Sequence, residues 1–155
     1  MTHTYEQQFR SYLQKQQIQA DHLSFEQSCH SVEEAAQAAQ ADPEDIVKSI
    51  CLLDEEDRLI VAIVKGADRV STSRVAKTLE RATVRMATPD EILARTGYPC
   101  GGTPALGYQA TFLVDQRVTE RETVFTGGGS ENSLLKIKTT ELLRANQAQI
   151  VRVRR

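Results

Sequence analysis

The spacing of hydrophobic and polar positions predicts several short helices. In the first, Tyr5, Phe9 and Leu13 recur every four residues and therefore share one helical face. Two others begin at a capping box, in which a Ser or Thr hydroxyl and a Glu three residues later each accept a backbone N–H. The expected helices span residues 4–17, 32–40, 71–80, 88–96 and 140–145, with a single turn after Asp42 and Pro43.

Apolar runs of four to eight residues between these helices predict strands. Residues 47–53 and 59–64 flank an acidic turn at residues 54–57, which predicts a hairpin. Further strands are expected at residues 83–86, 111–114, 118–125, 134–137 and 150–153. Because helices and strands alternate without a repeat, we predict an α/β (α+β) fold, with a mixed, partly closed sheet or barrel surrounded by helices. We expect one domain over residues 1–155.

Composition narrows the class of protein. The chain has 155 residues, is 40% hydrophobic and 26% charged, and carries a net charge of −2. This balance excludes a disordered tail and a strongly basic nucleic-acid coat protein. No apolar stretch approaches the ~20 residues of a membrane span, so no membrane partner is expected. Cys29, Cys51 and Cys100 match no zinc spacing; we expect free thiols in a cytoplasmic protein without metal or cofactor.

Charge is distributed unevenly. Residues 1–66 hold 5 Lys and Arg against 12 Asp and Glu, whereas residues 67–155 hold 14 against 9. Such an asymmetry can steer an anionic ligand to one side, although scattered charge gives the same counts. Arg74, Lys77 and Arg81 share one face of a predicted helix, which fits either phosphate contacts or an ordinary solvated face. Arginines between residues 152 and 155 add a second basic patch.

Two glycine clusters interrupt the pattern of helices and strands. Residues 97–107 combine four glycines with two prolines, and residues 126–130 contain three consecutive glycines. A stiff loop of this kind presents backbone amides that can hold a carbonyl or an anion. Tight turns between strands would have the same composition. Neither cluster has the spacing of a phosphate-binding or dinucleotide-binding loop.

Lys48 is a second anomaly, because it lies inside the apolar run at residues 46–53. A lysine pointing into the core would need a negatively charged or carbonyl partner, since burying an unpaired ammonium is costly. A lysine at the edge of the strand would instead discourage aggregation. Cys100, beside the first glycine pair, is a candidate nucleophile or a small residue that fills the loop. Histidine-based metal motifs and a nucleophile elbow are absent from the sequence.

In this order, these features resemble the YbaK/ProX family of aminoacyl-tRNA deacylases, which is related to the editing insertion of bacterial prolyl-tRNA synthetases. The resemblance covers roughly residues 22–150 and rests on the alanine-rich helix, the strand at residues 46–49, both glycine clusters and the strand that ends at Asp115. It implies hydrolysis of a mischarged tRNA, such as tRNAPro carrying Cys, Ala or another small residue. The implied partners are the acceptor end of an aminoacyl-tRNA and, as a second candidate, an aminoacyl-tRNA synthetase; no DNA is expected.

The resemblance also implies roles for particular residues. Lys48 would contact the terminal phosphate or the ester, and the amides of Gly101 and Gly102 would hold the substrate carbonyl or position the attacking water. The other implied residues are Ser49, Pro104, Gly129 and Ser130 for substrate binding, and Arg74, Lys77 and Arg81 for tRNA binding. Ser49 stands where alanine-specific subfamilies carry asparagine, so Cys, Ala, Ser and Thr all stay open.

An aminoacyl ester is already activated, so orientation and backbone donors could suffice without a strong nucleophile. Two alternatives remain at this point. A non-catalytic module of the same fold would bind tRNA ends or a synthetase, and would not need Lys48 and the glycine amides to converge. A hydrolase that uses Cys100 on another substrate would be sensitive to thiol alkylation.

Overall fold

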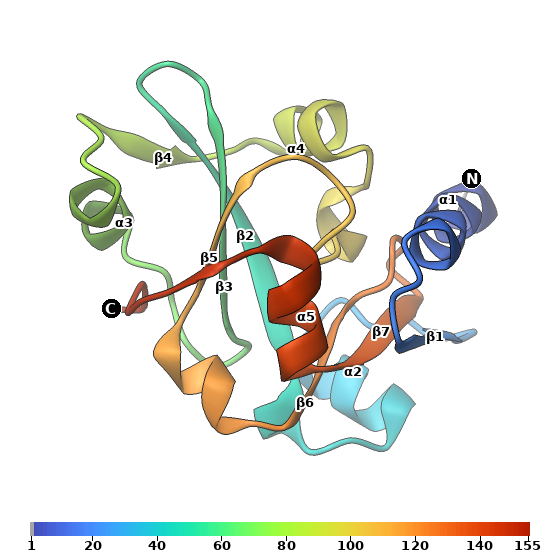
Figure 1. Cartoon of the computed structure of the whole chain (residues 1–155). Coiled ribbons are helices and arrows are strands. Elements are labelled where there is room, and N and C mark those ends of the chain that lie inside the picture. The colour runs from blue at the N-terminus through green and yellow to red at the C-terminus, as the bar shows by residue number, and fades with distance from the viewer. Residues whose placement is uncertain (1) are drawn as a thin grey trace.

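The structure is a computed structural model that describes residues 2–155, and it contains two sheets flanked by helices (Figure 1). The larger sheet contains, in spatial order, β4 (Val84–Met86), β2 (Val47–Asp54), β3 (Leu59–Lys65), β5 (Thr111–Val114) and β8 (Gln149–Ile150). The smaller sheet contains β1 (Ala20–Ser24), β7 (Ser133–Lys138) and β6 (Thr123–Gly127). β2 and β3 form the predicted antiparallel hairpin, whereas β3 pairs with β5 in parallel.

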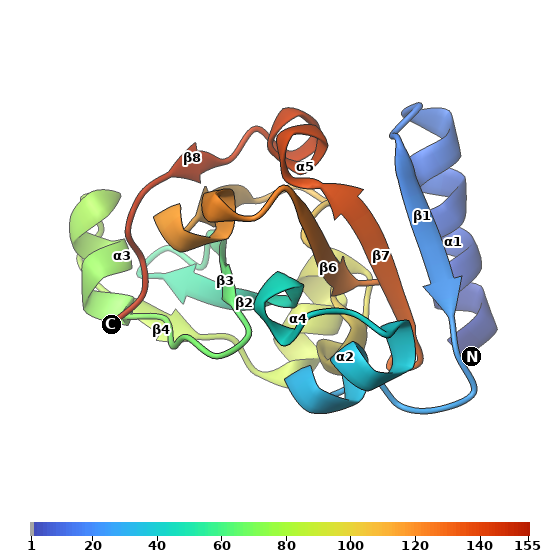
Figure 2. The same cartoon turned by 90° about the horizontal axis from the view of Figure 1, so that it is seen from below.

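Helices cover both sides of these sheets. They are α1 (Thr2–Lys15), α2 (Val32–Ala39), α3 (Thr72–Thr78), α4 (Pro89–Thr96) and α5 (Thr139–Asn146), with 3-10 turns η1 (Pro43–Asp45), η2 (Cys100–Gly102) and η3 (Gln116–Glu120). Both predicted capping boxes are present, at Ser31 and at Thr88. Figure 2 shows α1 lying along β1 at one side of the molecule and α3 beside the carboxyl-terminal end of the chain at the other.

The mixed α+β class is confirmed, but the expectation of a barrel is wrong, because the two sheets stay separate and do not close. The strand predicted over residues 118–125 is also shorter. The Asp115 carboxylate accepts the Arg117 N–H at 3.0 Å and caps η3, so β6 begins only at Thr123. The predicted final strand is reduced to β8. β1 was not predicted, since its sequence is largely polar and it forms by pairing with β7.

The core lies on both faces of the larger sheet. β3 is buried along its whole length because β2 and β5 flank it. The two sheets meet where Ile46 bridges Phe125. β4 pairs with only the last three residues of β2, Leu52–Asp54. Within residues 2–155, the first half of β2 therefore has no paired strand on the side away from β3. In the same part of the chain, no helix is both long and apolar enough to cross a membrane.

Candidate active site

A cavity of about 270 Å³ lies beside the open half of β2. The lining residues come from the start of β2, the region around the amino end of α2, the stretch from the end of β4 into α4, the two glycine clusters and the start of β7. Those that matter below are Lys48, Ser49, Cys51, His30, Gly101, Thr103 and Gly127. The strand edge that β4 leaves unpaired thus forms one wall of the cavity.

Lys48 lines this cavity and is half-buried. Burial lowers the pKa of its ammonium group, and nearby Arg69 lowers it further while Asp68 opposes the shift. No hydrogen bond or ion pair of the Lys48 side chain occurs within the part of the chain that the structure describes. Lys65, on the neighbouring strand, differs because its Nζ lies 2.7 Å from Glu44 Oε1. Lys48 is therefore a positive charge in a cavity with room for a partner from outside.

Ser49 lines the same cavity. Its Oγ is buried and, among the residues described, has no hydrogen-bond partner. A buried polar atom without a partner costs about 1–3 kcal/mol, so such atoms are usually satisfied. The Ser49 hydroxyl is thus suited to bind a polar group that enters the cavity.

The two glycines of the first cluster have different positions. Gly101 lines the cavity, whereas Gly102 is buried behind it. The Gly102 N–H donates to the Pro99 carbonyl at 3.0 Å, and the Gly102 carbonyl accepts the Gly129 N–H at 2.8 Å. A Cβ atom at Gly102 would lie 2.4 Å from the Ser130 carbonyl carbon. The expectation that both amides face the substrate is wrong for Gly102, which instead allows the two glycine loops to pack backbone to backbone.

The other expected substrate-binding residues lie behind the cavity wall. Ser130 is buried, and its hydroxyl donates to the Glu6 carboxylate at 2.8 Å. Gly129 is held against Gly102, and the Pro104 carbonyl accepts the Tyr108 hydroxyl at 2.6 Å. Of the four residues in this group, Ser49 alone lines the cavity. Gly129, Ser130 and Pro104 shape its wall indirectly.

A comparison with protein families identifies the kind of domain that contains this cavity. Residues 26–145 match the profile described as "Aminoacyl-tRNA editing domain". The chain belongs to this family. The resemblance drawn from the sequence motifs is thereby confirmed.

Relatives of this editing domain include free-standing proteins and parts of larger enzymes. The uncharacterized protein YwhH of Bacillus subtilis is 29% identical over 124 residues, which cover 79% of this chain and 78% of the relative. Proline–tRNA ligases of Thermotoga neapolitana and Thermotoga maritima are 26% and 27% identical over 98 and 103 residues. The matched part is 63% and 66% of this chain but 17% and 18% of the ligases, so the chain spans under a fifth of their length.

Solved structures share the fold over almost the whole chain. A candidate trans-editing enzyme for prolyl-tRNA synthetase superposes with a TM-score of 0.90 at 24% identity, covering 97% of both chains. The hypothetical protein APE2540 superposes with a TM-score of 0.87 at 26% identity, covering 96% of this chain and 99% of the other. The α+β architecture of the editing domain is therefore shared by these proteins.

Among the lining residues of the editing domain, Cys29, His30 and Cys51 were not expected from the sequence, whereas Cys100 was a candidate. All three cysteines of the chain line the cavity. Burial raises the pKa of Cys51 to about 12, and Cys29 is buried as well, whereas Cys100 is exposed. His30 also lines the cavity, and a Cβ atom at Gly101 would lie 2.9 Å from its Nδ1. No local signal in the sequence could bring these residues together, because they come from three separate segments of the chain.

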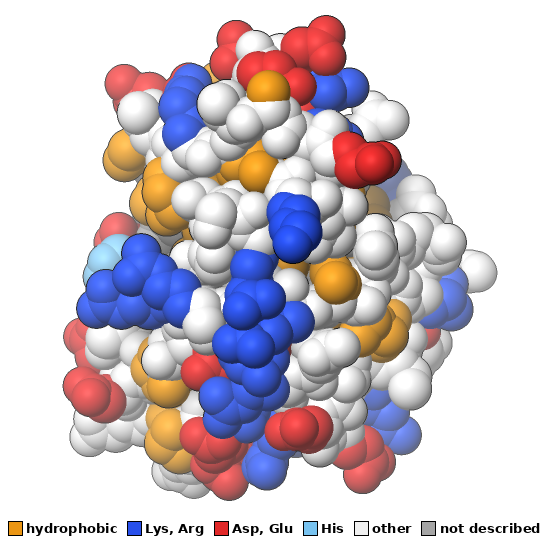
Figure 3. All heavy atoms as spheres, turned by 90° about the vertical axis from the view of Figure 1, so that its left-hand side faces the viewer, with side chains coloured by type: hydrophobic (Ala, Val, Ile, Leu, Met, Phe, Trp, Pro, Cys, Tyr) orange, Lys and Arg blue, Asp and Glu red, His pale blue; other side chains and the backbone are white. Residues whose placement is uncertain are grey.

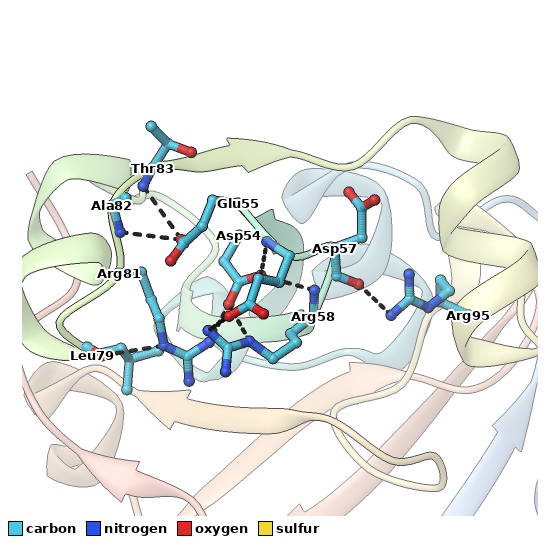
Figure 4. Close-up of polar contacts among 10 residues, drawn as sticks. Asp54, Glu55, Asp57, Arg58, Leu79, Arg81, Ala82, Thr83 and Arg95 are labelled. Atoms are coloured by element: carbon cyan, nitrogen blue, oxygen red, sulfur yellow. Dashed lines mark hydrogen bonds and ion pairs between the residues drawn. The ribbon is translucent and has the colours of Figure 1, made fainter.

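The three basic residues expected to bind tRNA also have different surroundings. Arg74 and Lys77 are exposed on α3. Arg81 instead donates to the buried carboxylate of Asp54 (Figure 4). The same carboxylate accepts Arg58 Nε at 2.7 Å and the backbone N–H groups of Glu56 and Arg58, both at 2.9 Å. The Arg81 guanidinium therefore has a structural partner, which the side chains of Arg74 and Lys77 lack within residues 2–155, and is a weaker candidate for tRNA binding.

Proposed function

We propose that this protein is a trans-editing aminoacyl-tRNA deacylase. It would hydrolyse the ester that links a small, wrongly attached amino acid to tRNA, with tRNAPro carrying Cys, Ala, Ser or Thr as candidate substrates. The observation that carries the proposal is Lys48, a half-buried ammonium group without a partner of its own among the described residues, in the same cavity as Gly101. Membership of the editing-domain family supports the same reaction.

The reaction needs little beyond positioning. A water oxygen bonds to the ester carbonyl carbon, the bond to the ribose oxygen breaks, and a proton from the water ends on that oxygen, which releases the amino acid and the tRNA. In our proposal the Gly101 amide stabilises the negative charge that develops on the carbonyl oxygen, as backbone donors do in other acyl transfers. Lys48 holds the terminal phosphate or the ester region, and the Ser49 hydroxyl binds a polar group of the aminoacyl moiety.

The size of the cavity supports a small amino acid. Its volume of about 270 Å³ lies just below the ~300–1,000 Å³ of sites that hold drug-sized ligands. Val47, Ile50 and Ile92 contribute apolar lining. A pocket of this kind gains only about 1–3 kcal/mol per methylene, so modest changes in its lining can change the preferred amino acid. Arg74 and Lys77 remain our candidates for phosphate contacts on α3.

A binding module without catalysis is the second candidate. It is favoured by the Gly102 amide, which donates to the Pro99 carbonyl and so leaves Gly101 as the one glycine of this pair that can donate a hydrogen bond to a ligand in the cavity. Such a module would recognise tRNA ends or an aminoacyl-tRNA synthetase.

A panel of charged tRNAs separates the two candidates. The protein is incubated with tRNAPro carrying Cys, Ala, Ser or Thr, beside correctly charged Pro-tRNAPro, and the remaining ester is measured over time. We expect loss of one or more mischarged species and a decrease of about 10²-fold or more for Lys48→Ala. Lys15→Ala, an exposed lysine at the end of α1, is the matched control and should leave the rate unchanged. Binding of tRNA without hydrolysis of any species would favour the module.

A further inference from the structure

We propose that Arg69, Arg152 and Arg155 form a track for the phosphate backbone of the RNA stem that leads to the cavity. The partner is thus a double-helical RNA end, and the inference rests on the function proposed above. These three arginines are called the arginine track below. They differ from Arg74, Lys77 and Arg81, which the resemblance implied for tRNA binding, and two of them belong to the basic patch at residues 152–155.

The track has a fixed backbone. The end of the chain runs beside residues 69–71: the Ser71 N–H donates to the Val153 carbonyl at 2.8 Å, and the Arg155 N–H donates to the Arg69 carbonyl at 2.8 Å. The fully buried Asp115 carboxylate accepts the Val153 N–H at 2.9 Å and holds the same segment from below. Arginines at these positions are therefore held on an ordered surface.

In the described part of the chain, some arginines on this surface have carboxylate partners and others do not. Arg154 lies 2.9 Å from the Asp115 carboxylate, and Arg117 lies 3.0 Å from Asp68, so these two arginines belong to the fold. Arg69, Arg152 and Arg155 are exposed, and no ion pair involves them within residues 2–155. Their guanidinium groups are therefore available to phosphates, and arginine suits phosphate because its planar donors bind two oxygens at once.

The track begins near the end of the β2–β3 hairpin that carries Lys48. In the β2–β3 hairpin Lys48 lies opposite Val64, and the Gly66 N–H donates to the Ile46 carbonyl at 2.8 Å. The chain then leads from this end of the hairpin to Arg69, whose charge is close enough to Lys48 to act on its ammonium group. An RNA stem lying on the track would therefore present its terminal nucleotide to Lys48.

Figure 3 shows the side of the molecule on which α3 and the carboxyl-terminal end lie. Lys and Arg side chains form a nearly continuous vertical band down the middle of this face, with acidic side chains mainly at its lower end and at the top. Figures 1 and 2 both place α3 beside the end of the chain, so this helix lies near the track. The net charge of −2 does not reveal this basic face, because acidic residues outnumber basic ones in the first 66 positions and offset the positive charge of the rest of the chain.

The test removes two charges from the track without touching the cavity. Arg152→Gln/Arg155→Gln is compared with Lys15→Gln/Lys138→Gln, which changes the net charge equally at exposed positions on α1 and β7. Binding of uncharged tRNAPro is measured across NaCl concentrations. Each lost phosphate contact reduces the slope of log affinity against log salt by about 0.7–0.9. We therefore expect a slope smaller by about 1.5 and binding at least tenfold weaker at 0.1 M salt, with the control within twofold of the parent protein.

Deacylation distinguishes failure of the track from failure of the proposed function. With mischarged tRNAPro, we expect KM to rise at least tenfold in the track variant while kcat stays within about twofold. An aminoacyl-adenosine, which has no stem, should be hydrolysed equally by both variants. If the track variant matches the control in salt slope and KM, the track is overturned although deacylation stands. If the parent protein binds tRNA through the track but hydrolyses nothing, the track stands and the deacylase proposal is overturned.

Discussion

The polar side chains at the two ends of β2 differ in whether they have partners within the protein. At its carboxyl end, the buried Asp54 carboxylate has two arginine partners and two backbone amides (Figure 4). At its amino end, the side chains of Lys48 and Ser49 have no partner among the described residues and line a cavity. The same strand therefore carries two polar clusters. The one at its carboxyl end, the closed end, has its hydrogen bonds satisfied within the protein, and the one at its amino end, the open end, is available to a ligand.

This difference follows from which neighbours each end has. β4 pairs with Leu52–Asp54 and brings the chain that follows α3, with Arg81, close to the carboxylate. Beside Lys48 that neighbour is missing, and the glycine loops enclose space instead. The closed end is expected to contribute stability, and the open end to contribute function.

Asp54→Asn should have the largest effect on folding. It removes the charge that Arg58 and the mostly buried Arg81 share, and breaking a buried ion pair costs about 3–5 kcal/mol. Urea unfolding would measure the change. Asp57→Asn, in the same turn but exposed, is the matched control and should change stability by less than about 0.5 kcal/mol. A loss below 1 kcal/mol for Asp54→Asn would show that the closed end is not a stabilising cluster.

The same carboxylate predicts how stability depends on pH. Burial alone would raise the pKa of Asp54, but the amides of Arg58 and Glu56 and the two guanidinium groups lower it overall. Because the folded state holds the charged form, this stabilisation is present above the unfolded pKa of about 3.9 and is lost as pH falls below it. Unfolding free energies at pH 3 and pH 6 should therefore differ less in Asp54→Asn than in the parent protein. Equal differences in the two proteins would contradict this.

At the open end, the two neighbouring glycines should respond differently to alanine. A Cβ at Gly102 meets the backbone of Ser130 at 2.4 Å, which cannot move without separating the glycine loops, so we expect a loss of about 1–3 kcal/mol. At Gly101 the atoms nearest to the Cβ belong to the side chains of Glu131 and His30, which are exposed and can rotate away. Gly101→Ala should stay within about 1 kcal/mol of the parent in thermal or urea unfolding. Similar losses at both positions would place both glycines in the packing.

Much of the fold could be predicted because its signals are local. The capping boxes at Ser31 and Thr88 and the hairpin around residues 54–57 are written in adjacent residues, and each was found where expected. β1 has no such signal, since a polar five-residue segment becomes a strand only through pairing with β7. The prediction of a barrel was wrong because the order of strands along the sequence does not determine which strand edges pair in space.

The candidate site was predictable only in part for the same reason. Lys48 and the glycine clusters were visible as departures from pattern, and Lys48 does line a cavity with Gly101. Sequence spacing could not show that Gly102 would donate to Pro99, nor that Arg81 would bind a carboxylate 27 positions earlier. Both facts depend on contacts between distant segments.

The smallest expected effect on stability is that of replacing Lys48, which is best compared with Lys65 on the other strand of the hairpin. Lys48→Met removes a half-buried charge that has no protein partner in the described structure, so stability should stay the same or rise by up to about 1 kcal/mol. Lys65→Met, the same substitution on β3, removes a bond of 2.7 Å from a buried ammonium to Glu44 and should cost about 1.5 kcal/mol or more. Urea unfolding of both variants measures the contrast. If Lys48→Met were the more destabilising, Lys48 would have a structural partner and the amino end of β2 would be closed like the other.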